Sequence, residues 1–225
     1  MDNGLFITFE GIDGCGKSSL LQALAEHWKY NSTIVTTKEP GGSELGKHLR
    51  ALLQEQPVAL NPQAEFLLFA ADRSQHFSTV VLPALQQGAL VLSDRCADSS
   101  VAYQGYGGSL SIEMIQTVNA WSMHNRQPDI TIYVRTSREI ALQRCSSRNE
   151  KLTAFELRGS DFWNKVTLGF DTLFTGNPRA IIVDGNQPRE ALIKDTLMAI
   201  ARHLHNSPWH TKLFTPINKE HTAQL

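Results

Sequence analysis

The chain has 225 residues, with 21 Lys and Arg, 22 Asp and Glu, and a formal net charge of −1. This balance gives no sign of a nucleic-acid-binding or membrane-binding surface, and no apolar run approaches the ~20 residues of a membrane span. Cys15, Cys96 and Cys145 lack metal-ligand spacing and are too few for a disulfide framework. We therefore expect a cytoplasmic protein without a signal peptide.

Apolar runs typical of buried strands alternate with segments of helical periodicity along the chain. The predicted strands are 5–10, 33–37, 90–94, 130–134 and 180–184. The predicted helices are 18–28, 43–54, a long helix that begins at the cap Asn61-Pro62, 111–125, a helix from the capping box at 136–139 to Ser147, 161–174 and 188–204. This alternation predicts an α/β fold with a five-stranded parallel sheet covered by helices on both faces. We expect one domain over 1–205 and a polar surface tail over 206–225.

The segment from Gly11 to Ser18 matches G-x-x-x-x-G-K-[ST], the phosphate-binding loop, and follows a predicted strand and precedes a predicted helix. Its glycines let backbone N–H groups and the helix N-terminus hold phosphate oxygens. Lys17 is then expected to reach the β- and γ-phosphates, and Ser18 to bind Mg²⁺. The predicted ATP-binding residues of this segment are Gly11, Ile12, Asp13, Gly14, Cys15, Gly16, Lys17, Ser18 and Ser19.

Among phosphate-loop proteins, the sequence favours a small kinase. A switch GTPase needs an N-K-x-D motif, which the sequence lacks, and a motor is usually longer. A small kinase needs a second pocket whose arginines neutralise the phosphate being transferred. Arg73, Arg95, Arg144 and Arg148 lie in loops or at the ends of predicted elements, whereas Arg50 fits an ordinary amphipathic helix.

Four segments, in order along the chain, resemble the thymidylate kinase family. They are FEGIDGCGKS (9–18), KEPGG (38–42), LFAADR (68–73) and DRCADSSVAYQG (94–105), of which the last is the most specific. The resemblance runs from residue 5 to about residue 204. It implies a P-loop NTPase fold with a small lid at about 144–159, and transfer of the ATP γ-phosphate to dTMP to give dTDP in dTTP synthesis. It also implies Mg²⁺ as cofactor and a homodimer.

The resemblance also implies a set of residues that bind the acceptor nucleotide. They are Asp13, Glu39, Phe69, Arg73, Arg95, Ser100, Tyr103 and Gln104. Phe69 would stack on thymine, Arg73 would donate to a base carbonyl, and Tyr103 would lie against the sugar and disfavour a 2′-hydroxyl. Ser100 and Gln104 would lie near the base. Core packing is the alternative for Phe69, and helix capping or surface polarity for Ser100 and Gln104.

The remaining implied roles concern the phosphates and the metal. Asp13 would contact the deoxyribose 3′-hydroxyl, and Arg95 would bind the phosphate of dTMP. Asp94 ends an apolar strand, as the acidic metal partner of these folds does, and would organise Mg²⁺ together with Ser18.

A mobile cation is also expected at the transferring phosphate. Some family members place this arginine in the phosphate loop, where this chain has Gly14, and the bacterial type places it in the lid. The lid departs from the expected pattern, because Thr153-Ala154 stands where an arginine should precede the pair Phe155-Glu156. Arg144 is expected to pack on adenine. The predicted catalytic residues are Lys17, Arg95, Arg148 as the first lid choice and Arg158 as the second.

Three other functions stay open at this point, and the first is another nucleoside monophosphate kinase, which the segment 94–105 disfavours. A deoxynucleoside kinase would use a carboxylate base after the second strand, where Glu39 stands. A non-catalytic nucleotide-binding relative is favoured only by the altered lid. The helices near 66–85 and 112–123 carry enough apolar residues for a dimer interface, or belong to the core.

Overall fold

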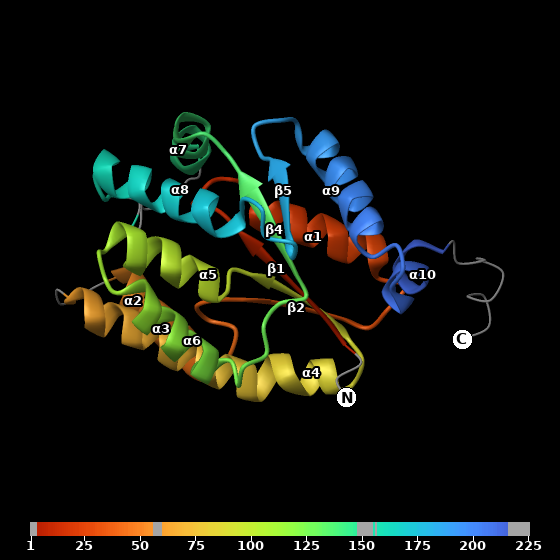
Figure 1. Ribbon diagram of the computed structural model, residues 1–225, viewed down its shortest axis with the longest axis horizontal. Helices are drawn as coiled ribbons and strands as arrows, with labels where there is room; N and C mark the ends of the chain where they lie inside the picture. Colours follow the sequence, from red (N-terminus) through yellow and green to blue (C-terminus); the bar gives the residue numbers. More distant parts are fainter. Residues whose placement is uncertain (1–3, 56–59, 148–154, 156, 216–225) are drawn as a thin grey trace.

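A five-stranded parallel sheet forms the centre of the protein (Figure 1). The computed structural model describes residues 4–55, 60–147, 155 and 157–215. The strands are β1 (Leu5–Glu10), β2 (Ile34–Lys38), β3 (Leu90–Asp94), β4 (Ile130–Arg135) and β5 (Ala180–Asp184). Their order in the sheet is β2-β3-β1-β4-β5, and every neighbouring pair is parallel. The predicted strands and the predicted fold class are confirmed, with strand ends within one residue of expectation.

Helices cover both faces of this sheet. They are α1 (Lys17–Trp28), α2 (Glu44–Glu55), α3 (Pro62–His76), α4 (Leu82–Gln86), α5 (Ala97–Ser100), α6 (Ile112–Ser122), α7 (Arg138–Ser146), α8 (Ser160–Phe174), α9 (Arg189–His203) and α10 (Pro208–Phe214), with two π-helical segments, η1 (Phe77–Val81) and η2 (Val101–Gly107). Figure 1 shows α1 and α9 on one side of the sheet and α3, α4 and α6 on the other.

The alternation of side chains along β1 explains why the sheet needs both layers. Ile7 and Phe9 pack with Leu24 of α1, whereas Phe6 points the other way and meets the ring of Phe77 edge-on, with ring centroids 5.7 Å apart. Phe6, Ile7 and Phe9 are completely buried. A strand that is apolar on both faces is stable only when both faces are covered, as in doubly wound folds.

Some helices differ from expectation. The cap at Asn61 is confirmed, since its side chain accepts from the Ala64 N–H at 2.8 Å, and the long helix expected after it runs through η1 to the end of α4. The helical stretch 97–107 was not predicted, because it contains few residues of strong helix propensity. Segments α5 and η2 carry several of the predicted substrate-binding residues.

The expectation of a plain surface tail from residue 206 is wrong for α10. The helix begins with Ser207, whose side chain accepts from the Trp209 N–H at 3.2 Å, and its Leu213 is buried. Phe214 meets the ring of Trp28 edge-on at 5.8 Å, so α10 packs on the end of α1. A seven-residue helix is too short to show a clear periodic pattern, which explains why the sequence did not reveal it.

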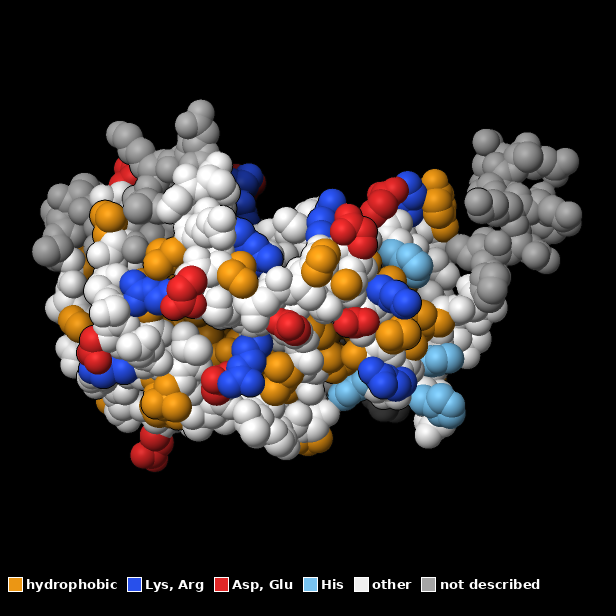
Figure 2. All heavy atoms as spheres, turned by 90° about the horizontal axis from the view of Figure 1, so that it is seen from above, with side chains coloured by type: hydrophobic (Ala, Val, Ile, Leu, Met, Phe, Trp, Pro, Cys, Tyr) orange, Lys and Arg blue, Asp and Glu red, His pale blue; other side chains and the backbone are white. Residues whose placement is uncertain are grey.

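Acidic and basic side chains are interspersed on the face seen in Figure 2, in keeping with the balanced composition. Among the described residues, no helix is long and apolar enough to cross a membrane.

Candidate active site

The phosphate-binding loop joins β1 to α1 at the carboxyl end of the sheet. Gly11, Gly14 and Gly16 have φ values of 141°, 83° and 99°, which residues with a Cβ rarely adopt. A Cβ on Gly14 would lie 2.2 Å from the backbone oxygen of Ala141 in α7. The loop is therefore packed tightly under α7, and no side chain fits at position 14.

Lys17 and Ser18 occupy the start of α1, where the motif predicts them. Lys17 is buried, and its Nζ donates to the backbone oxygen of Ile12 at 3.3 Å and lies 4.0 Å from the Asp13 carboxylate. The Ser18 hydroxyl donates to the carboxylate of Asp94. Strand register explains this last contact, because Asp94 of β3 pairs with Phe9 of β1, directly before the loop.

Arg95 links the loop to the second half of the site. Its backbone has φ 73°, in the left-handed region. NH1 donates to the backbone oxygen of Gly11 and to Ser99 Oγ, both at 2.9 Å. NH2 donates to Asp13 Oδ1 at 2.7 Å and to the Tyr103 hydroxyl at 3.1 Å. Asp13, Arg95 and Tyr103 are thus brought together as predicted.

The charge of Arg95 governs the ionisation of Asp13. Burial alone would raise the pKa of Asp13, but the positive charges of Arg95 and Lys17 and the hydrogen bonds from Arg95 and Tyr103 lower this pKa to about 2. Asp13 therefore carries a full negative charge at neutral pH, which suits an acceptor for a sugar hydroxyl.

Glu10 is a functional candidate that the sequence reasoning missed, although it lies inside the quoted motif. Its carboxylate accepts from the Cys96 N–H at 2.7 Å and from the Ser99 hydroxyl at 2.5 Å. Both partners lie in the short segment that follows Arg95. Burial, followed by the negative charge of Asp98, raises the pKa of Glu10 to about 8. Only the three-dimensional pairing of β1 with β3 reveals this contact.

An acceptor pocket opens beside this network and encloses about 690 Å³, including its mouth. It is lined by Asp13, Glu39, Pro40, Arg50, Leu53, Gln54, Phe69, Arg73, Arg95, Cys96, Ser99, Ser100, Tyr103, Gln104 and Phe155. All eight predicted substrate-binding residues line it. They come from the phosphate-binding loop, the loop after β2, α3, the residue after β3, α5 and η2.

Each nitrogen of the buried Arg73 guanidinium donates a hydrogen bond to a neighbouring residue. Its Nε donates to Glu39 at 2.9 Å, NH1 to Asn119 Oδ1 at 2.8 Å, and NH2 to Ser100 Oγ at 3.0 Å. His76 Nδ1 lies 3.0 Å from the other oxygen of Glu39. Sequence patterns gave no signal for Asn119 and His76, which reach Arg73 and Glu39 from distant parts of the chain.

Glu39 therefore forms an ion pair with Arg73 and is not a free carboxylate in the pocket. Burial alone would raise its pKa, but the charge of Arg73 and the hydrogen bond with His76 lower the pKa of Glu39 below its ordinary value. A carboxylate stabilised in its charged form by two neighbours is a poor general base.

A second cavity runs along the phosphate loop and meets the acceptor pocket. It is lined by Asp13, Gly14, Gly16, Lys17, Ser18, Ser19, Leu21, Gln22, Thr37, Lys38, Glu39, Arg50, Asp94 and Arg95. Both cavities share Asp13, Glu39, Arg50 and Arg95. Arg50, which donates to the backbone oxygen of Pro40 at 3.0 Å, is a further residue that the sequence reasoning missed. The amphipathic pattern of α2 suggested that Arg50 lies on the solvent side of the helix, whereas in the structure Arg50 lines both cavities.

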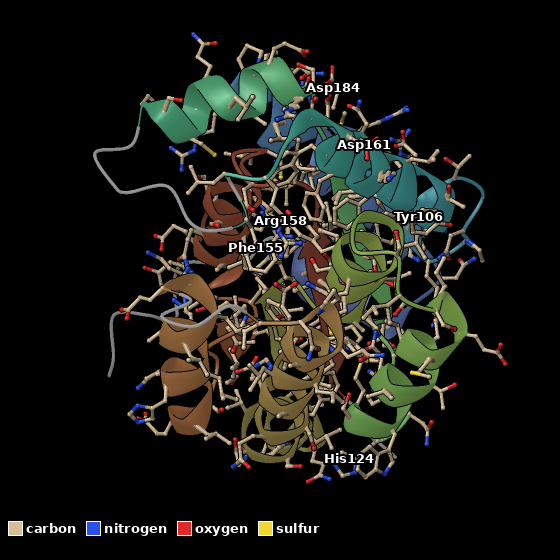
Figure 3. The ribbon with its side chains drawn as sticks, turned by 90° about the vertical axis from the view of Figure 1, so that its left-hand side faces the viewer. Tyr106, His124, Phe155, Arg158, Asp161 and Asp184 are labelled. Atoms are coloured by element: carbon tan, nitrogen blue, oxygen red, sulfur yellow. The ribbon has the colours of Figure 1, made fainter. Side chains whose placement is uncertain are left out.

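The arginines of the lid region take different positions. Arg144 of α7 donates to the backbone oxygens of Gly185 at 2.9 Å and Cys15 at 3.3 Å, and so lies over the end of the phosphate loop. Figure 3 shows Arg158 and Phe155 where the segment before α8 meets α3. Arg158 pairs with Glu65 at 2.7 Å and lines neither cavity. Arg148 and Lys151 lie outside the described residues.

Comparison with known proteins identifies the family. The sequence model described as "Thymidylate kinase" matches residues 9–196. A thymidylate kinase of Exiguobacterium is 39% identical over 198 residues, covering 87% of this chain and 93% of the relative. One from Clavibacter sepedonicus is 40% identical over 192 residues, covering 84% and 90%.

A solved structure agrees with these relatives. The crystal structure of thymidylate kinase from Ehrlichia chaffeensis superimposes with a TM-score of 0.69 at 29% identity, covering 88% of this chain and 98% of the other. The central sheet and the phosphate loop thus form a P-loop NTPase fold of this type. The chain belongs to the thymidylate kinase family and is an enzyme that phosphorylates dTMP to dTDP with ATP.

Proposed function

We propose that dTMP binds in the acceptor pocket and ATP along the phosphate loop, with their phosphates meeting at the wall that the two cavities share. The observation that carries this proposal is that Asp13, Arg50 and Arg95 line both cavities. A phosphoryl group that passes from one nucleotide to the other is transferred at this junction of the two cavities. Two arginines and Lys17 surround it and can stabilise the negative charge of the transition state.

The base of dTMP lies at the closed end of the pocket, where Phe69 offers a ring for stacking and Arg73 is held rigidly by Glu39 and Asn119. A rigid guanidinium favours a carbonyl oxygen on the base, because an amino group there would leave donors facing donors. Tyr103, tied to Arg95 and Asp13, lies on the sugar side. This arrangement supports thymine as the base and deoxyribose as the sugar.

The residues at the phosphate loop fit a magnesium ion. The Ser18 hydroxyl and the Asp94 carboxylate lie in contact and offer hard oxygen ligands, which Mg²⁺ prefers together with phosphate oxygens and water. A magnesium ion held there would neutralise negative charge on the phosphates. Asp94 and Ser18 hold its place, while Lys17 leaves Ile12 and binds the phosphates.

No general base is required of the protein in this reaction. The attacking atom is an oxygen of the dTMP phosphate, which is already ionised at neutral pH, so the site must bring it in line and shield charge. Arg95 has the contacts to position this phosphate. One further cation is supplied by the lid, because position 14 admits no side chain. We assign this role to Arg148 or Arg158, with Arg148 preferred.

A coupled assay with dTMP, dUMP and thymidine, each with ATP and Mg²⁺, tests the proposed function. We expect dTMP to be the best substrate, dUMP to be weaker for lack of the methyl contact, and thymidine to be inert. Phosphorylation of thymidine without that of dTMP would identify a deoxynucleoside kinase. That outcome is disfavoured by Glu39, whose oxygens are taken by Arg73 and His76.

We further propose that the enzyme is a homodimer joined through α3 and α6. These helices pack together through buried Phe66 and Ile115, yet their outer faces carry Leu67, Met114 and Trp121, which are 58%, 63% and 79% exposed. Large exposed apolar side chains on adjacent helices mark a protein interface. Light scattering of the purified chain should give twice the monomer mass, and Trp121→Glu should give the monomer mass.

We also infer a cytoplasmic enzyme with a single domain. All three cysteines are buried thiols, as expected in a reducing compartment. Imaging of the fluorescently tagged chain tests the compartment. Residues 144–159 are proposed as the lid of the domain.

A further inference from the structure

Glu65 of α3 contacts two different parts of the active site with its two carboxylate oxygens. Oε1 accepts a hydrogen bond from Gln104 Nε2 at 3.0 Å, and Oε2 pairs with Arg158 NH2 at 2.7 Å. Its side chain is only 5% exposed. Gln104 lines the acceptor pocket, so Glu65 lies directly behind a residue that faces the bound nucleotide.

The contact with Glu65 determines which end of the Gln104 amide faces the pocket. A carboxylate has only acceptor atoms, whereas a glutamine amide has a donating NH₂ and an accepting oxygen. The NH₂ of Gln104 must therefore turn toward Glu65. The amide oxygen is the end left for the nucleotide, and it can only accept a hydrogen bond.

Arg158 supplies the positive charge that offsets the burial of Glu65. Its guanidinium lies between two aromatic rings, 4.6 Å from the centroid of Phe155 and 4.6 Å from that of Phe162. The rings and the ion pair hold Arg158, whose side chain is 30% exposed, in place beside Phe155 (Figure 3). Because Glu65 is buried, loss of the guanidinium that pairs with it should disturb how Glu65 holds Gln104.

We propose that Glu65 and Arg158 are positioning residues that determine the base specificity of the acceptor pocket. They hold Gln104 with its amide oxygen toward the base, so the pocket prefers a base that donates from ring nitrogen N3. Thymine and uracil donate there, whereas N3 of cytosine accepts. This inference rests on the proposed binding of dTMP in this pocket, and it adds a determinant of specificity separate from Arg73.

The matched ligands dUMP and dCMP test the orientation of Gln104, because neither has a 5-methyl group. They differ only at N3 and at the 4-substituent. The variant Glu65→Gln keeps the shape of the side chain but can donate as well as accept, so Gln104 can turn its NH₂ toward the base. The Kd of each ligand is measured by competition against dTMP.

In Glu65→Gln, the ratio of the dCMP Kd to the dUMP Kd should fall at least about tenfold, the order expected for one mispaired hydrogen bond in a pocket. The ratio does not depend on the fraction of folded protein, so partial misfolding does not imitate the result. Glu113→Gln, on the exposed surface of α6, is the matched control and should keep the wild-type ratio. An unchanged ratio in Glu65→Gln overturns the proposal.

Two variants of Arg158 test its part. Arg158→Ala removes the guanidinium that pairs with Glu65 and should lower the same ratio, whereas Arg158→Lys, which keeps the charge, should largely preserve it. If Arg158→Ala lowers kcat equally for all acceptors and leaves the ratio unchanged, Arg158 acts on the phosphate and its positioning role is wrong. Failure of the wild-type protein to phosphorylate dTMP would instead overturn the proposed function.

Discussion

The carboxylate of Glu10 accepts a hydrogen bond from the backbone N–H of Cys96 at 2.7 Å, immediately after the left-handed backbone of Arg95. The last residue of β1 thus holds the turn at the end of β3. The same carboxylate accepts from Ser99, and Ser99 in turn accepts from Arg95. The position of Arg95 therefore depends on a buried acid that lines neither of the two cavities.

Replacement of Glu10 by Gln should change how stability depends on pH. The folded-state pKa of about 8 is above the ordinary 4.5, so the folded form holds a proton that the unfolded chain releases. The stability that this shift contributes is fully present below about pH 4.5 and is lost as the pH rises to about 8. The Tm of the wild type should decline over this range, and that of Glu10→Gln should decline less. Equal declines would show that Glu10 is not the group responsible.

Lys17→Ala should remove a charge that stabilises the transition state more than the bound substrates. We expect a loss of at least ~10²-fold in kcat, comparable to the removal of an electrostatic donor in other enzymes. Steady-state kinetics with dTMP and ATP measure it. A variant with near-wild-type turnover would contradict the proposed role of the phosphate loop.

Arg50→Ala should weaken the binding of dTMP, because Arg50 lines both cavities and faces the place where the phosphates meet. The KM for dTMP should rise about tenfold or more, the order of one charge-assisted hydrogen bond. Arg189→Ala, exposed on α9, is the control for loss of a positive charge. An unchanged KM and kcat would show that Arg50 does not contribute to the binding of dTMP.

Arg148→Ala should lower kcat strongly and change the KM for dTMP little. That pattern marks an interaction made mainly in the transition state. A large loss in Arg158→Ala instead would move the catalytic role to Arg158 and leave the lid mechanism intact. If Arg148→Ala, Arg158→Ala and Lys151→Ala all keep full turnover, the cation does not come from the lid.

Local patterns in the sequence predicted the five strands and the phosphate loop, because each of these is encoded by neighbouring residues. The residues proposed to bind the acceptor came instead from the resemblance to the thymidylate kinase family. The partners that hold the site in place were not predictable in the same way. Glu65, His76 and Asn119 lie in unremarkable helical stretches, and only packing brings them to Gln104, Glu39 and Arg73. Strand register, likewise, decides that Asp94 meets Ser18.

Because α10 packs on α1, we expect that a chain without α10 is less stable than the full chain. Truncation after residue 205 would remove Phe214 and Leu213 and uncover Trp28, which is completely buried in the full chain. It would also remove the backbone oxygens of Lys212 and Thr215 that accept from Asn31. A protease that cuts before α10 should therefore leave a fragment that melts at lower temperature and whose Trp28 fluorescence shifts to the red.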